Sequence, residues 1–94
     1  MVGDVVSAQS SIAAAGFLDI QPGAGVEWVI HNIYHEAEVE ISQYDGTNSI
    51  VFDEDTGAGV YARYAFHCTN GLRIRVKNTN AAAKRIGYDG IVTK

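Results

Sequence analysis

Short runs of alternating apolar and polar residues, each closed by a turn signal, most limit what this chain can form. Residues 37–44 alternate cleanly, with Ala37, Val39 and Ile41 on one side. An Asp-Gly pair follows at residues 45–46, and such pairs accept the positive φ of tight hairpin turns. Because alternation with a period of two indicates a half-buried strand, the pattern predicts a β-hairpin rather than a helix.

The same pattern recurs along the chain and predicts seven or eight short strands, spaced roughly 8–12 residues apart. The expected strands cover residues 17–20, 26–34, 37–44, 49–52, 60–67, 72–77 and 84–92. Regular short strands without a long helical pattern predict a single all-β domain. The expected architecture is a small antiparallel β-sandwich or barrel, with a jelly roll among the topologies that fit.

The first sixteen residues lack this alternation. Residues 7–15 are rich in Ser and Ala, and their periodicity favours neither a strand nor a helix. We therefore expect residues 1–16 to form an extended N-terminal arm, followed by a β-sandwich domain at residues 17–94. The first four residues contain no Lys or Arg, unlike the charged start of a secretory signal, so we expect a protein made in the cytoplasm.

Length and composition exclude several classes of protein. Ninety-four residues with a net charge of −4 leave room for one domain and disfavour a basic nucleic-acid module. The apolar stretch at residues 12–18 is far shorter than the roughly 20 residues that a membrane helix needs. Cys68 is the only cysteine, so an intrachain disulfide is excluded.

The charges are divided sharply along the chain. Residues 1–62 carry ten acidic residues and neither Lys nor Arg, whereas residues 63–94 carry all seven basic residues and one acidic residue. Within each part, three like charges share a face at a period of two. These six candidate assembly and charge-pairing contacts are Glu36, Glu38, Glu40, Arg73, Arg75 and Lys77.

Three interpretations of this division remain open. Acidic and basic strands can lie side by side in one sheet, where each opposite-charge pair contributes roughly 0.2–1 kcal/mol. The acidic face of one copy can instead meet the basic face of another. Nucleic-acid binding by the basic segment is the weakest interpretation, because the chain is acidic overall and lacks a recognised motif.

The histidines and the cysteine do not form a metal site by their spacing. His31 and His35 share one side of the expected strand, but residues four apart on a strand are separated by about 13 Å. One metal ion cannot bridge that distance unless the chain turns. His67 and Cys68 are adjacent and point to opposite faces of an extended segment. We therefore expect no metal site.

Other catalytic and ligand-binding patterns are incomplete. Asp53, Asp55 and Gly57 match part of a calcium loop, whose further oxygen ligands and closing Glu are missing. The alternating glutamates resemble paired catalytic carboxylates, but a chain this short rarely forms a deep sugar cleft. We expect neither enzymatic activity nor a cofactor.

The aromatic residues are expected to pack in the core or at its rim. The alternative is an aromatic binding platform for a sugar or a protein, formed from Trp28, Tyr34, Tyr44, Tyr61, Tyr64 and Tyr88. Of these, Trp28 is the candidate aromatic contact for a ligand.

Four segments resemble those of small structural proteins of tailed bacteriophages: Glu27–His35, Tyr44–Ser49, Asp55–Gly59 and Ile86–Gly90. The resemblance implies a capsid decoration or cement protein, which binds the outer surface of the virion shell in many copies and reinforces it. It implies the major capsid protein as a partner, and a dimer or trimer of the chain itself. It also implies an N-terminal arm that becomes ordered on assembly, with neither nucleic acid nor membrane as a partner.

A second function class stays open. The chain can instead be a glycan- or receptor-binding β-sandwich module of a phage tail or baseplate. A glycan binder needs exposed aromatic rings flanked by carboxylates or amides, so the environment of Trp28 distinguishes the two functions.

Overall fold

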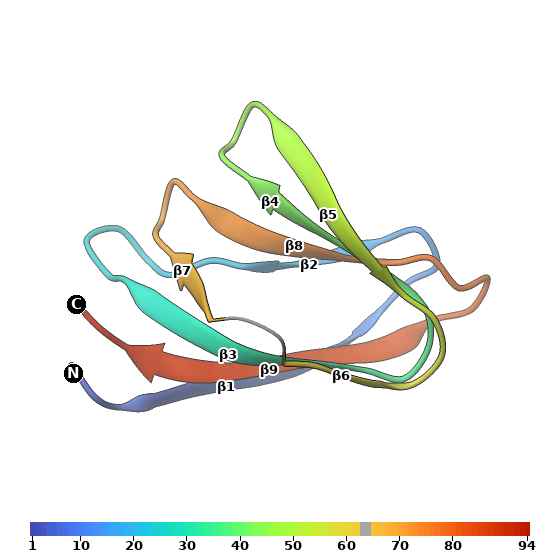
Figure 1. Cartoon of the computed structure of the whole chain (residues 1–94), viewed down its shortest axis with the longest axis horizontal. Helices are drawn as coiled ribbons and strands as arrows, with labels where there is room; N and C mark the ends of the chain where they lie inside the picture. The colour runs from blue at the N-terminus through green and yellow to red at the C-terminus, as the bar shows by residue number, and fades with distance from the viewer. Residues whose placement is uncertain (63–64) are drawn as a thin grey trace.

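The computed structural model describes residues 1–62 and 65–94, and the strands that it contains confirm the all-β prediction (Figure 1). The strands are β1 (Val5–Ile12), β2 (Phe17–Ile20), β3 (Trp28–His35), β4 (Val39–Tyr44), β5 (Ser49–Asp55), β6 (Gly59–Tyr61), β7 (Phe66–Cys68), β8 (Arg73–Asn78) and β9 (Lys84–Val92). Across the described residues, no helix is long and apolar enough to cross a membrane.

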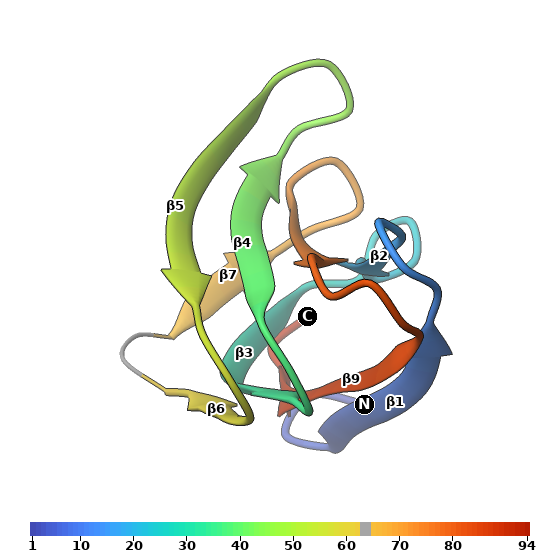
Figure 2. The ribbon, with the colours of Figure 1, turned by 90° about the vertical axis from the view of Figure 1, so that its right-hand side faces the viewer.

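The strands form two antiparallel sheets packed as a sandwich. The first sheet has the order β1-β9-β3-β6, with β7 also pairing with β3, and the second has the order β2-β8-β4-β5. Figure 2 shows the two layers, with β1, β9 and β3 below and β4 and β5 above. The predicted antiparallel β-sandwich is therefore confirmed.

The strand pairs are nested one inside the other. The β4–β5 hairpin is innermost, β3 pairs with β6 and β7, β2 pairs with β8, and β1 pairs with β9. Successive pairs alternate between the two sheets, which is the arrangement of a jelly roll. The nesting brings the early strands β1, β2 and β3 beside late strands. β4 pairs with the late strand β8 on one side and with β5 on the other, and both β4 and β5 come from the acidic part of the chain.

The expectation of an extended N-terminal arm at residues 1–16 is wrong. Val5–Ile12 forms β1, which pairs along its whole length with β9. Only Val6 and Ile12 of this strand are half-buried, and the others are exposed. The strand lies at a sheet edge and has no fully buried face, so its residues lack the alternation that marks the other strands.

Most other expected strand ends lie within two residues of the observed ones, and two expected strands differ by more. The expected strand at 60–67 is divided into β6 and β7, and Arg63 and Tyr64 within it lie outside the described residues. Residues 53–55, which lie beyond the expected strand at 49–52, continue β5 and pair with β4. The acidic side chains therefore belong to a sheet edge rather than to a loop.

The core lies between the two sheets and comes from alternate positions on the strands. Its fully buried side chains include Ile20, Ile30, Ile33, Ile41, Val76 and Ile86. One glycine is required by the closeness of this packing. A Cβ atom at Gly90 of β9 would lie 2.1 Å from the carbonyl oxygen of Val29 on β3, so no larger residue fits without moving a strand.

Candidate functional site

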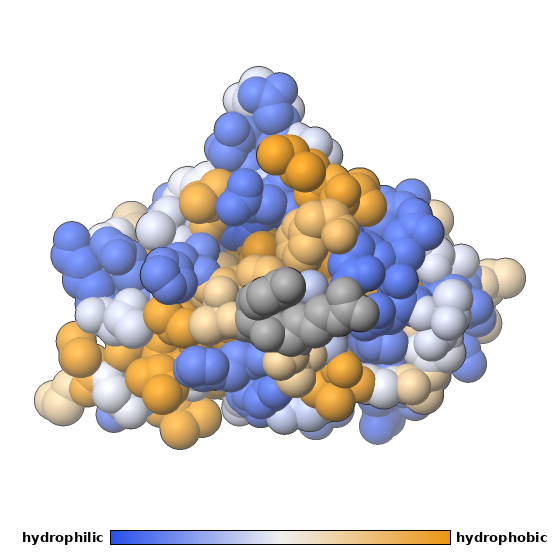
Figure 3. All heavy atoms as spheres, viewed as in Figure 1, coloured by the Kyte–Doolittle hydropathy of each residue, from blue (hydrophilic) through white to orange (hydrophobic). Residues whose placement is uncertain are grey.

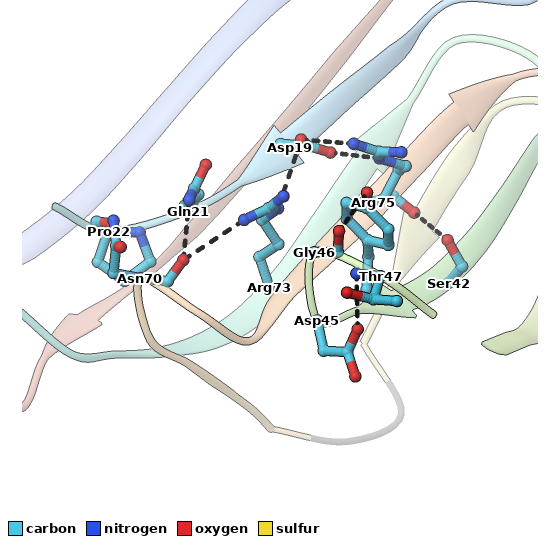
Figure 4. A network of polar contacts seen from close by, with 11 residues as sticks. Asp19, Gln21, Pro22, Ser42, Asp45, Gly46, Thr47, Asn70, Arg73 and Arg75 are labelled. Carbon is cyan, nitrogen blue, oxygen red and sulfur yellow. Dashed lines mark hydrogen bonds and ion pairs between the residues drawn. The ribbon is translucent and has the colours of Figure 1, made fainter. Parts of the chain in front are cut away.

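The predicted basic triplet lies on the outer face of the second sheet. Ile74 and Val76 of β8 point into the core, so the alternating residues Arg73, Arg75 and Lys77 point away from it. Figure 4 shows the two arginines reaching the same carboxylate, that of Asp19 on the neighbouring strand β2. The positive charges on this face are thus partly neutralised within the chain.

Arg75 is the most fully engaged of the three basic residues. Its Nε and Nη2 atoms donate to the two carboxylate oxygens of Asp19 at 2.7 and 2.9 Å. Its guanidinium lies 3.8 Å from the ring centroid of Phe17 and 4.1 Å from that of Tyr44. The hydrogen bonds to Asp19 raise the pKa of Arg75, so the group is held as a cation between two aromatic rings.

Arg73 makes a looser version of the same contacts. Its Nε atom lies 3.6 Å from Oδ2 of Asp19, and its guanidinium lies 4.7 Å from the ring centroid of Tyr44. A further hydrogen bond of 3.4 Å reaches the carbonyl oxygen of Asn70. Both arginines therefore join β2, β4 and the loop before β8 into one polar network.

The predicted glutamates do not face this triplet as a set. Glu40 lies directly opposite Lys77 in the sheet register. Glu38 precedes β4 and accepts a hydrogen bond from the side-chain amide of Asn80, which lowers the pKa of the Glu38 carboxyl. Glu36 is exposed, and its Oε1 atom accepts from the backbone N–H of Arg85 at 2.6 Å.

The six candidate contacts are therefore brought together only at Glu40 and Lys77. Sequence reasoning missed Asp19, the carboxylate that binds both arginines. The sequence did contain a signal for this role. Asp19 is the charged residue of the short apolar strand at residues 17–20, and within that strand it shares a face with Phe17 alone. The contacts of Asp19 support the intramolecular interpretation of the charge division.

The acidic residues at the end of β5 differ from Asp19 in their surroundings. Glu54 lies directly opposite Glu40, so two like charges face each other across the β4–β5 pair. Among the described residues, no Lys or Arg forms an ion pair with Asp53, Glu54 or Asp55. The edge of the second sheet is therefore left with a net negative charge.

One of these carboxylates meets a buried histidine. Oδ2 of Asp55 lies 3.4 Å from Nε2 of His35, whose side chain is only 3% exposed. The other ring nitrogen, Nδ1, lies 2.9 Å from the carbonyl oxygen of Ala37 and 3.0 Å from that of Gly57. His35 therefore links β3 to the end of β5 and to the turn that follows it.

The middle of β5 is apolar and exposed. Ile50, Val51 and Phe52 are consecutive and have exposed fractions of 63%, 48% and 40%. Figure 3 shows apolar side chains gathered over β5. Phe52 also contacts Tyr61 and Phe66 through ring centroids 6.4 and 5.4 Å apart, so this surface continues towards the first sheet.

Trp28 does not present an exposed ring. It is half-buried, packs against the core, and its ring centroid lies 6.1 Å from that of Tyr88. Trp28 also lines a hollow with Cys68 and Lys94. An exposed aromatic residue is found instead at Tyr34, whose exposed fraction is 44%.

The other sequence candidates stay apart. His31 is exposed and His35 is buried, as the bulge between Ile30 and Asn32 turns β3 between them. Within residues 1–62 and 65–94, no group of three His, Cys, Asp or Glu side chains is arranged to hold a metal ion. Cys68 is buried, and burial raises the pKa of its thiol to about 11.

No protein-family model matches this chain, and no curated protein is significantly similar to it.

Proposed function

We propose that this chain is a non-enzymatic structural protein of a tailed-phage virion, which binds the outer surface of the capsid and stabilises the shell. The observation that carries the proposal is the apolar edge at Ile50, Val51 and Phe52 of β5. The resemblance of four segments to small phage structural proteins supplies the choice of partner.

An exposed apolar sheet edge is a surface suited to contact with another protein chain. Within the described residues β5 pairs only with β4, so its other edge offers free backbone N–H and C=O groups. Natural proteins usually protect such edges with charges, prolines or bulges, because they pair readily with other strands. Three acidic residues and a bulge at Phe52 protect the far end of β5, but Ile50 and Val51 carry no charge and are exposed. This exposed apolar stretch is consistent with a partner that covers it.

The charges beside this edge favour a basic partner surface. Asp53, Glu54 and Asp55 continue β5 directly after the apolar residues, and Glu40 adds a fourth carboxylate on β4. We expect the capsid protein to place Lys or Arg residues opposite them. Burial of the apolar side chains would supply affinity, and the charges would set orientation and specificity.

The proposal includes two or three copies of the chain at each attachment site on the virion surface. Light scattering of the purified chain at low and high salt tests this part. A dimer or trimer that dissociates at high salt would place charged groups at its interface. A monomer at both salt concentrations would remove self-association from the proposal.

Co-sedimentation with capsids tests the attachment itself. Virions that carry the chain are stripped of it, and the shells are then mixed with Val51→Asp or with the control Val5→Asp. Both valines are exposed, at 48% and 77%, but Val5 lies on β1 in the other sheet. We expect Val51→Asp to lose shell binding and Val5→Asp to retain it.

Two results would reject this function. The first is absence of the chain from purified virions by mass spectrometry. The second is equal shell binding by the wild type and Val51→Asp, which would remove the β5 edge as the attachment surface.

A further inference from the structure

The outer face of the first sheet contains a hollow of about 470 Å³ between β1, β9 and β3. Its floor is Gly87 of β9, whose cross-strand neighbours are Gln9 and Tyr34. Ile86 and Tyr88 point into the core, so Gly87 faces away from it. A Cβ atom at Gly87 would lie 2.9 Å from the Cβ atom of Gln9, so the hollow depends on the absence of a side chain there.

A carboxylate is held in a fixed orientation beside this floor. Asp89 lies two residues after Gly87 on the same face, and its Oδ1 atom accepts from Nδ2 of Asn32 at 2.8 Å. Its Oδ2 atom accepts from the hydroxyl of Tyr34 at 2.6 Å, and this bond raises the pKa of Tyr34. The tyrosine therefore stays protonated, and each carboxylate oxygen keeps a free lone pair for a ligand.

Other polar groups around the hollow are free to bind. The side chains of Ser7 and Gln9 on β1, and the guanidinium of Arg85 on β9, have no hydrogen-bond or ion-pair partner among the described residues. Together they offer both donors and acceptors. The Tyr34 ring adds an exposed aromatic surface at the same place.

We propose that this hollow binds a pyranose unit of a neutral polysaccharide. A pyranose carries adjacent hydroxyl groups, which donate to a fixed carboxylate such as Asp89 and accept from an amide or a guanidinium. One flank of the sugar ring is lined by C–H bonds and packs against an aromatic side chain such as Tyr34. The volume of the hollow lies in the roughly 300–1,000 Å³ range of small-ligand sites.

The charges favour a neutral ligand over an anionic one. Asp89 and Glu36 both border the hollow, against the one cation of Arg85. A phosphate or carboxylate group would be repelled by two carboxylates of the site. The hollow also belongs to the sheet opposite β5, so attachment to a shell through β5 would leave it open, and this inference does not rest on the proposed function.

Nuclear magnetic resonance titration of the full chain tests the site. The ¹⁵N-labelled protein is titrated with hexasaccharides of glucose, mannose, galactose and N-acetylglucosamine, and separately with inorganic phosphate. We expect at least one hexasaccharide to give saturable amide shifts confined to the surroundings of Gln9, Tyr34 and Gly87. We expect phosphate to give none.

Substitutions separate recognition from folding. Asp89→Asn should weaken sugar binding by about tenfold, since one charged hydrogen-bond acceptor is worth roughly that factor. Gln9→Ala should weaken it less, and Gln43→Ala serves as the matched control. Gln43 is also an exposed strand glutamine, but it lies on β4 in the other sheet.

Three results would overturn the assignment. These are the absence of a saturable shift with all four hexasaccharides, shifts centred outside the hollow, or equal weakening by Gln9→Ala and Gln43→Ala. A response to phosphate alone, without a saturable shift for any hexasaccharide, is a case of the first result and rejects a neutral sugar as the ligand. Shell binding by Asp89→Asn should match the wild type, so failure of this site and failure of the attachment surface are distinguishable.

Discussion

Asp19 binds Arg75 through two hydrogen bonds, of 2.7 and 2.9 Å, which join β2 to β8 across the second sheet. Asp19 comes from the acidic part of the chain and Arg75 from the basic part. Their pairing follows from the nested strand order, which sets β2 beside β8. The uneven charge distribution thus helps to fix the pairing of strands that are 56 residues apart in sequence.

Loss of this pair should destabilise the fold measurably. Asp19→Ala leaves the Arg75 guanidinium without its carboxylate, and both side chains are about three-quarters buried. We expect a loss of about 1–2 kcal/mol in the free energy of unfolding, measured by urea denaturation. A double-mutant cycle with Arg75→Gln should give a coupling energy, and additive effects of the two substitutions would contradict the assignment.

The buried thiol of Cys68 should be unreactive in the folded protein. Burial raises its pKa to about 11, so almost no thiolate forms at pH 8. We expect a disulfide reagent to label Cys68 only after unfolding in urea. Rapid labelling under native conditions would show that the strand β7 opens readily.

The same thiol should make stability fall in alkali. Between about pH 9 and pH 11 the unfolded chain loses the thiol proton while the folded chain keeps it, so stability decreases as pH rises. Cys68→Ala should show a smaller decrease in melting temperature over this range. A residual decrease is expected from Tyr88, whose pKa is also raised by burial.

The hairpin turn after β4 should lose stability in acid. The backbone N–H groups of Asn48 and Thr47 donate to Oδ1 of Asp45 at 2.7 and 2.9 Å and lower the pKa of this carboxyl. Stability from these bonds is present above the unfolded pKa near 4 and is lost as pH falls through the lower folded value. Asp45→Asn should therefore flatten the acid limb of a melting-temperature profile between pH 2 and pH 5.

Much of the fold could be predicted because most strands have one buried face. The expected strand at 17–20 coincides with β2, and the expected strand at 84–92 coincides with β9. Burial of one face of a strand shows in the sequence as an alternation of apolar and polar residues. β1 was not predicted, because an edge strand without a fully buried face leaves no such pattern. The hollow on the first sheet was harder to predict from the sequence, because Asp89, Tyr34 and Gly87 come together only through the pairing between β3 and β9.

Gly90 lies where β9 approaches β3 closely. A Cβ atom there would meet the backbone of Val29 and Ile30 at 2.1 and 2.8 Å. We expect Gly90→Ala to destabilise the protein by about 3 kcal/mol. Gly59→Ala is the control, because nothing lies within 4 Å of a Cβ atom at that position.

Asn78 should be the least replaceable polar residue of the core. It is fully buried, and its Nδ2 atom donates at 2.9 Å to the carbonyl oxygens of both Ile12 and Ala82. Its amide therefore ties the β1–β2 connection to the β8–β9 connection. Asn78 begins a polar run that is typical of an exposed turn, so the residue pattern does not predict this role.

Asn78→Asp retains the shape of the side chain but removes both donors and sets a carboxylate against carbonyl oxygens. Leaving buried polar groups unpaired costs about 1–3 kcal/mol each, so we expect a loss of at least about 3 kcal/mol in urea denaturation. Asn48→Ala, at an exposed turn position, should change the free energy of unfolding by less than about 0.5 kcal/mol. If Asn78→Asp were as mild as Asn48→Ala, the amide would not be what joins the two connections.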